Sequence, residues 1–206
     1  MIKEKIKFLF YMLSHPVDAF YELRHRGKGS MALALIVVFL AGVAFCLDKR
    51  YSSFVVNATD TREVKSVMYI SAMFLLFFLF CIGNWAVTCL TDGEGRMKDI
   101  ITATGYALLP LPLFYLPAVL ISQVIAGDEA VFYTLLIGIS IVWAALLVIM
   151  GNMVIHNYTI MKELKTLVLT IVAMIIILFI LLLFYSIFRQ IVEFVKSLYT
   201  ELIYRM

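Results

Sequence analysis

The chain has 206 residues, of which 64% are apolar and 15% are charged, and its mean hydropathy is +1.00. A typical soluble domain is about 45–50% apolar and about 25% charged, and a soluble fold of this size cannot bury so much apolar surface. The composition excludes a soluble enzyme, a disordered chain and a nucleic-acid-binding module, and the net charge of +3 is too small to indicate a polyanionic partner. It indicates a polytopic membrane protein.

Residues 1–30 precede the first long apolar stretch and carry six lysines and arginines. One helical face of this segment is apolar, and Pro16 suits the first position of a second short helix. We therefore expect residues 1–30 to form a cytoplasmic amphipathic segment at the membrane surface. The apolar face consists of Ile2, Ile6, Leu9 and Leu13.

Five apolar stretches are long enough to cross a membrane as helices. About 20 apolar residues cover a hydrocarbon core of about 30 Å, and none of the five stretches contains Lys, Arg, Asp or Glu. Backbone polar groups in lipid must be satisfied within the segment, which favours helices. The sequence thus predicts an all-α polytopic bundle over residues 31–188. Its five transmembrane helices are expected at Met31–Leu47, Val67–Leu90, Ile100–Ile125, Val131–Ile155 and Leu167–Phe188.

The loop between the second and third spans has the most distinctive sequence in the chain. Two glycines and several carboxylates stand close together there, which is typical of a tight turn followed by a helix cap. The same residues could dock a partner, and their oxygens could hold a hard cation. The spacing favours the turn, and we expect no metal. As a partner-binding loop it would use Asp92, Gly93, Glu94, Gly95 and Arg96.

The third span contains Pro110, Pro112 and Pro117. Proline inside a spanning helix kinks or breaks it, and a broken helix can form a substrate site near the middle of the membrane. The fourth and fifth spans contain no proline. Because a matching break in a second half of the chain is missing, a single kinked helix is favoured over a transport site.

Polar residues at membrane depth are few, and Asn84, Tyr106 and Asn152 are the main ones. Side-chain amides in spans usually bond across helices, and we expect this of Asn84 and Asn152. No ionisable pair suited to proton relay or covalent catalysis lies within the spans. The sequence therefore predicts neither an enzyme nor a cofactor.

Residues 189–206 follow the fifth span and alternate apolar with charged or polar positions at helical spacing. This pattern predicts an amphipathic C-terminal helix, which either lies on the membrane or extends the fifth span. The flanks of the spans carry ten lysines and arginines on the N-terminal side and seven on the other side. The positive-inside rule then places the N-terminus in the cytoplasm and the C-terminus outside.

Several of these features together resemble the Yip domain (Ypt-interacting protein) family of five-span membrane proteins. The resemblance covers almost the whole chain and is most specific in its centre. It implies five spans with a cytosolic N-terminus. The matching residues are His15-Pro16 with Phe20-Tyr21, Arg24 with Gly27-Lys28-Gly29-Ser30, Trp85, Asp92-Gly93-Glu94-Gly95, and Ala103 with Tyr106-Ala107 and Pro110.

The resemblance also implies a class of function. Eukaryotic members are membrane adaptors for Rab-type GTPases in ER–Golgi trafficking and carry a longer polar N-terminal region than the 30 residues present here. The chain is therefore more similar to bacterial plasma-membrane members, which accompany ABC-type transport systems, and no enzymatic reaction is implied. The resemblance assigns the contact surface to Asp92–Gly95 and architectural support to Tyr106 and Pro110.

These observations predict a non-enzymatic accessory protein that contacts the lipid bilayer and binds another integral membrane protein, such as a transporter complex, or a second copy of itself. The alternative is a channel or transporter for a small solute or ion, with the third span lining a path beside Asn84 and Asn152. A trafficking adaptor for a Rab-type GTPase is a lesser alternative. A cation-dependent enzyme at the Asp92–Asp99 loop is the least favoured.

Overall fold

The computed structural model describes residues 2–57 and 64–205. Over these residues the chain is helical and contains no strand, and five of its helical stretches are long and apolar enough to cross a membrane. The predicted all-α, five-span class is confirmed. The α-helices are α1 (Ile2–Ser14), α2 (Pro16–Arg26), α3 (Met31–Tyr51), α4 (Ser66–Leu90), α5 (Met97–Ala107), α6 (Pro110–Ser122), α7 (Ala130–His156) and α8 (Ile160–Arg205), and a 3₁₀ turn, Gly127–Glu129, precedes α7.

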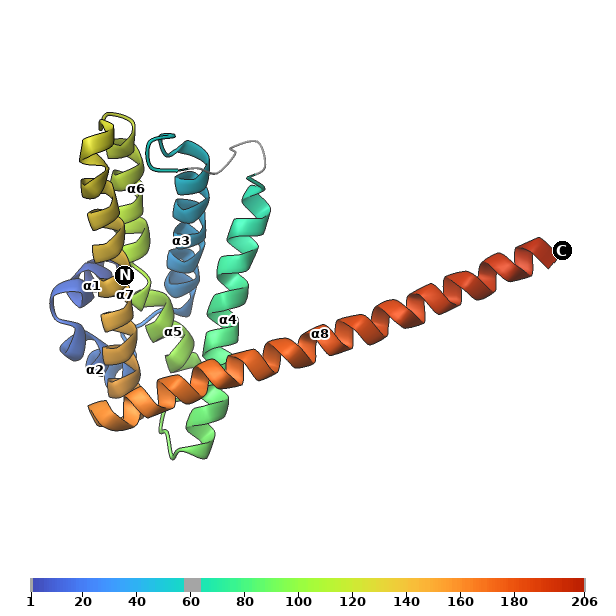
Figure 1. Cartoon of the computed structure of the whole chain (residues 1–206). Helices are drawn as coiled ribbons and strands as arrows, with labels where there is room; N and C mark the ends of the chain where they lie inside the picture. The colour runs from blue at the N-terminus through green and yellow to red at the C-terminus, as the bar shows by residue number, and fades with distance from the viewer. Residues whose placement is uncertain (1, 58–63, 206) are drawn as a thin grey trace.

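Helices α3, α4, α6 and α7 stand side by side and form the body of the bundle (Figure 1). Small residues let them approach closely. A Cβ on Gly105 of α5 would lie 2.7 Å from the Cβ of Ala34 in α3, and one on Gly42 would lie 3.2 Å from the Cα of Ile70 in α4. These contacts fix α3 at the centre of the bundle, where it touches α4, α5 and α6.

The third span consists of two helices, α5 and α6, separated at Leu108 and Leu109. Pro110 occupies the first turn of α6, where its missing N–H costs no helical hydrogen bond. Its carbonyl accepts a hydrogen bond from the Ser140 hydroxyl of α7 at 3.2 Å. Pro112 and Pro117 lie within α6, which continues through both.

The two N-terminal helices pack on the same side of the bundle, against α5 and α7 (Figure 1). Phe8 and Met12 of α1 are buried in the main core, and the Phe8 ring lies 6.5 Å from the ring of Tyr106. Phe20 of α2 is fully buried against Gly151 of α7. The buried face of α1 thus consists of Phe8, Leu9 and Met12, so of the predicted apolar face Leu9 is buried whereas Ile6 is 43% exposed.

Helix α8 runs without interruption through both the predicted fifth span and the predicted C-terminal helix. No glycine or proline occurs between Ile160 and Arg205, so nothing in the sequence ends the helix. Its first turns cross α4 at Gly83, where a Cβ would lie 3.1 Å from Cγ of Met174. Beyond this crossing the helix leaves the bundle (Figure 1), and most of its apolar side chains are exposed. The 189–205 segment is therefore an extension of the fifth apolar helix.

The end of the bundle opposite the N-terminal helices is held together by a buried carboxylate. Asp48, near the end of α3, is 3% exposed and accepts hydrogen bonds from the hydroxyl of Ser52, at 2.9 Å, and from the hydroxyl of Tyr133 in α7. Lys49 lies 3.7 Å from the second carboxylate oxygen. A buried charge is tolerated when such partners surround it, so Asp48 connects α3 to α7 at this end.

Candidate functional site

The polar loop after α4 is a tight turn that folds back under the helix. Asp92 has a φ of +54°, in the left-handed region, and the N–H of Gly93 donates to the carbonyl of Thr88 at 2.8 Å. A left-handed residue just past the last helical turn is a common way to end a helix and satisfy its free carbonyls. The turn directs the following residues back towards the end of α7.

Both glycines of the loop are required by close packing against His156 and its neighbours. A Cβ on Gly93 would lie 2.7 Å from the Tyr158 hydroxyl and 2.8 Å from Nδ1 of His156. A Cβ on Gly95 would lie 2.5 Å from Cε1 of His156 and 2.6 Å from Cγ2 of Ile155. Such distances leave no room for any side chain. The loop is therefore seated on the C-terminal end of α7.

His156 links this loop to the interior of the bundle. The backbone N–H of Gly95 donates to its Nδ1 at 3.3 Å, and its Nε2 lies 3.2 Å from Oδ1 of Asn84 in α4. A backbone N–H can only donate, so Nδ1 is the acceptor, and the proton on Nε2 is donated to Asn84. The imidazole is thus a neutral bridge from the loop to α4, and its side chain is almost fully buried.

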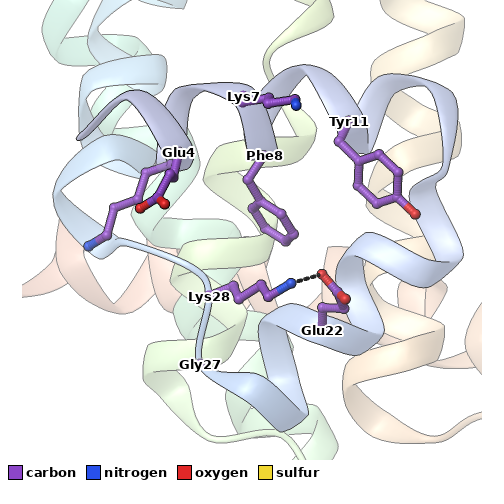
Figure 2. Close-up of a pocket in the computed structure, with 8 residues that line it drawn as sticks. Glu4, Lys7, Phe8, Tyr11, Glu22, Gly27 and Lys28 are labelled. Carbon is purple, nitrogen blue, oxygen red and sulfur yellow. Dashed lines mark hydrogen bonds and ion pairs between the residues drawn. The ribbon is translucent and has the colours of Figure 1, made fainter. Parts of the chain in front are cut away.

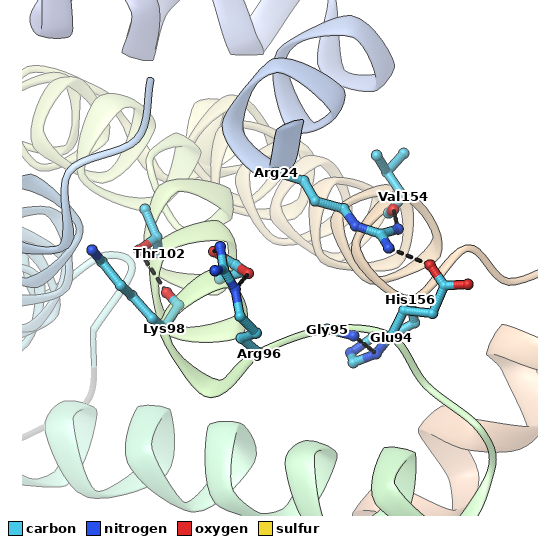
Figure 3. Close-up of polar contacts among 9 residues, drawn as sticks. Arg24, Glu94, Gly95, Arg96, Lys98, Thr102, Val154 and His156 are labelled. Atoms are coloured by element: carbon cyan, nitrogen blue, oxygen red, sulfur yellow. Dashed lines mark hydrogen bonds and ion pairs between the residues drawn. The ribbon is translucent and has the colours of Figure 1, made fainter. Parts of the chain in front are cut away.

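An arginine of α2 holds the loop from the other side. Arg24 donates from Nη1 to the carbonyl of Val154 at 3.0 Å and forms an ion pair through Nη2 with Glu94 (Figure 3). The hydrogen bond from Arg24 lowers the pKa of the Glu94 carboxyl below its usual value, so Glu94 is charged at neutral pH. Helices α2 and α7 and the loop are joined by one side chain.

Tyr158, just beyond α7, also holds the loop in place through its hydroxyl. Its hydroxyl lies 2.9 Å from the hydroxyl of Thr91 and donates to the Thr91 carbonyl at 3.0 Å. Burial raises the pKa of the phenol, which keeps it protonated and able to donate. The ammonium of Lys162 stands 4.3 Å from the centre of the ring, within the range of a cation–π contact.

The charged side chains of the loop are exposed to solvent, whereas its two glycines pack against His156. Asp92, Glu94 and Arg96 are exposed. Arg96 pairs with Asp99 in the first turn of α5 at 2.8 Å, which raises the pKa of the guanidinium. The structure thus brings the five predicted loop residues into one small, fixed surface; their binding of a partner remains a prediction.

The predicted intramembrane residues lie inside the bundle. Asn84 and Asn152 are both buried, and Asn152 is one helical turn before the His156 that bonds Asn84. Tyr106 is fully buried, and its hydroxyl accepts the backbone N–H of Ser30 at 2.9 Å, just before α3 begins. Tyr106 therefore ties the start of the first span to the third.

Sequence reasoning missed Glu163, which is fully buried in the first turn of α8. Its carboxylate faces Asn152, yet neither carboxylate oxygen nor the amide nitrogens of Asn84 and Asn152 has a hydrogen-bond partner within the described residues. Glu163 lies four residues before the apolar run that begins at Leu167, so the sequence places it outside the predicted span. The spacing of Glu163, Thr166 and Thr170 on one helical face, all of them buried, was the available signal.

The residues that the structure describes contain no group of three or more His, Cys, Asp or Glu that could hold a metal ion. Polar groups of the loop are hydrogen-bonded or ion-paired with side chains of α2 and α7, and His156 extends this network to Asn84 of α4.

One comparison with known proteins identifies the family. A family model described as the Yip1 domain matches residues 10–184. No curated protein and no solved structure matches the chain. The matched region includes the loop, the helices against which it packs and the first 25 of the 46 residues of α8, and it covers most of the 206 residues. The chain therefore belongs to the Yip1 domain family.

Proposed function

We propose that this multi-pass membrane protein of the Yip1 domain family is a non-enzymatic accessory subunit that binds and organises another membrane assembly. The observation that carries the proposal is α8, a long apolar helix that lies mostly outside its own bundle. The resemblance to bacterial members favours an ABC-type transporter as the partner and a bacterial plasma membrane as the location, with the N-terminus cytoplasmic and the C-terminus external.

The length of α8 supports the binding of a protein partner in addition to contact with lipid. At 1.5 Å per residue its 46 residues extend about 69 Å, more than twice the hydrocarbon thickness of about 30 Å. Apolar side chains such as Ile175, Phe179 and Leu182 are each about three-fifths exposed. The last turns carry the Arg189–Glu193 ion pair at 2.9 Å, so they suit an aqueous or interfacial environment. A helix of this length offers both an apolar and a charged contact surface.

The loop offers a second contact surface that is already ordered. Gly93 and Gly95 are packed and Glu94 is paired with Arg24, so the exposed charges need little further ordering when a partner binds. Association costs less when the binding groups are held in place beforehand. We therefore assign the partner contact to Asp92, Glu94 and Arg96 together with α8.

The test is purification of the tagged chain from its native membrane in mild detergent, followed by mass spectrometry. We expect a stoichiometric membrane partner to co-purify. The double variant D92A/E94A is expected to lose this partner while still inserting. D128A/E129A, which removes two exposed carboxylates near the start of α7, is expected to retain it. A wild-type protein that purifies alone, or equal loss in both variants, contradicts the proposed contact.

A channel or transporter is the second candidate, and one observation favours it. Asn84, Asn152 and Glu163 lie inside the bundle, and each has a polar atom without a hydrogen-bond partner among the residues that the structure describes, as groups lining a polar path would. This function predicts solute or ion flux in liposomes that contain only this protein, with the flux lost in Glu163→Leu. Liposomes that stay tight with the wild-type protein exclude it.

A further inference from the structure

A pocket of about 640 Å³ opens between α1 and the linker that joins α2 to α3. Figure 2 shows Phe8 extending from α1 towards the Lys28–Glu22 ion pair, with Glu4 and Tyr11 to either side of it and Lys7 at the outer edge of α1. The volume lies within the range of about 300–1,000 Å³ typical of ligand pockets. The lining residues are Glu4, Lys5, Lys7, Phe8, Tyr11, Glu22, Gly27 and Lys28.

The pocket is a fixed part of the fold. Phe8 is 9% exposed and packs with Met12 into the main core, which holds α1 in place. On the opposite wall Glu22 accepts hydrogen bonds from Lys28 at 2.8 Å and from Arg26 at 2.9 Å. These two cations lower the pKa of the Glu22 carboxyl, so this wall is charged and paired at neutral pH.

The unbalanced charge in the pocket is positive. Three lysines and two glutamates line it. Glu22 is already paired, and Glu4 also has an interaction within the chain. Lys5 and Lys7, by contrast, form no ion pair with any residue that the structure describes. Their ammonium groups are therefore available to an anion.

The residues next to the pocket indicate that it lies at the membrane surface, where an anion in it would be part of a lipid headgroup. Lys28 is three residues before Met31, where the first span begins. Ile6 and Phe10, beside the lysines on α1, are 43% and 54% exposed. A short helix with exposed apolar side chains next to lysines lies at the boundary between lipid tails and headgroups. Phosphate groups of phospholipids occupy the same depth.

We propose that this pocket binds the phosphate-bearing headgroup of an anionic phospholipid. Lys5 and Lys7 flank the pocket and pair with the phosphate, and the hydroxyl of Tyr11 supplies a further donor. This site is separate from the loop after α4 and does not depend on the proposed partner. It gives the N-terminal helices a specific lipid ligand in addition to general contact with the bilayer.

The experiment is a titration of the full-length protein in detergent with phosphatidylglycerol, read by native mass spectrometry, with phosphatidylcholine as the neutral probe. A basic side chain near an anionic lipid surface contributes about 1 kcal/mol, or about fivefold in affinity. K5Q/K7Q is therefore expected to weaken phosphatidylglycerol binding by about 25-fold. K5R/K7R is expected to bind like the wild type.

The matched control is K165Q/K196Q, which removes two exposed lysines of α8 and the same amount of charge. We expect it to bind within twofold of the wild type. Equal weakening in the two double variants overturns the proposal, since it would mean general attraction to charge, and so does equal binding of the two lipids. Complete displacement of the lipid by millimolar inorganic phosphate also overturns it, because it would show a site for a free anion.

Discussion

Replacing Gly95 with alanine is expected to unseat the loop after α4. The new Cβ would lie 2.5 Å from Cε1 of His156 and 2.6 Å from Cγ2 of Ile155, so the backbone must move away. That movement breaks the hydrogen bond from the Gly95 N–H to His156 and weakens the pairing of Glu94. Overpacking of this kind costs about 1–3 kcal/mol.

The same chain offers a control that isolates the steric effect. Gly138 lies within α7, and a Cβ there would meet nothing within 4 Å. Alanine is favoured over glycine inside a helix by about 0.5–1 kcal/mol, so Gly138→Ala is expected to leave stability unchanged or raise it. The two variants add the same methyl group and differ only in its surroundings.

Thermal unfolding can be followed by a thiol-reactive fluorophore. Cys46 and Cys81 are buried and react only when the bundle opens, whereas the exposed Cys89 is first replaced by serine. For a chain of this size 1 kcal/mol shifts Tm by about 2–4 °C, so Gly95→Ala is expected to lower Tm by about 2–12 °C. A Gly95→Ala protein that melts at or above the wild-type Tm refutes the packing of the loop against His156.

Three further predictions concern single side chains. Because pairing with Arg24 lowers the pKa of Glu94, the pair stabilises the fold above the ordinary carboxyl pKa of 4.5, and this stability is lost as pH falls through the pKa of Glu94 in the folded protein. An Arg24→Gln protein should lose this part of the acid dependence of Tm. An acid profile of Tm that is unchanged in Arg24→Gln contradicts the ion pair. Tyr106→Phe should lower stability by about 1–3 kcal/mol, because the Ser30 N–H loses its acceptor, and a Tm equal to wild type counts against that bond. Glu163→Gln removes a buried carboxylate that has no hydrogen-bond partner in the described part of the chain and should raise Tm, whereas a fall in Tm means that the carboxylate is paired.

The five spans were predictable because hydropathy and length alone determine them. Each predicted stretch overlaps one candidate span, and no charged residue interrupts the apolar core of any of them. The continuity of α8 could also be expected, since 46 residues pass without glycine or proline. A helix break at the prolines of the third span was predicted, but its position at Leu108 and Leu109 was not, because three nearby prolines give the same signal and only one of them begins a helix.

The interior of the candidate site was less predictable, because it depends on contacts between distant residues. The sequence suggests a turn at Gly93 and Gly95, but the reason for glycine is the ring of His156, about 60 residues further along. Glu163 lies just outside the longest apolar run of the fifth span, and its burial beside Asn152 of α7 arises only in the folded chain. A single sequence can show that Glu163, Thr166 and Thr170 share a helical face, but it does not show which distant residues they contact.

The short joint between α7 and α8 lies at one end of a long, uninterrupted helix. Three residues connect the two helices, and the first of them, Asn157, has a left-handed φ of +55°. Beyond it stands one unbroken rod of about 69 Å, so a rotation of about 5° at the joint displaces the far end by about 6 Å. The joint contains Tyr158, against which the loop after α4 packs. A rotation at this joint would therefore move the far end of α8 much further than it moves the loop.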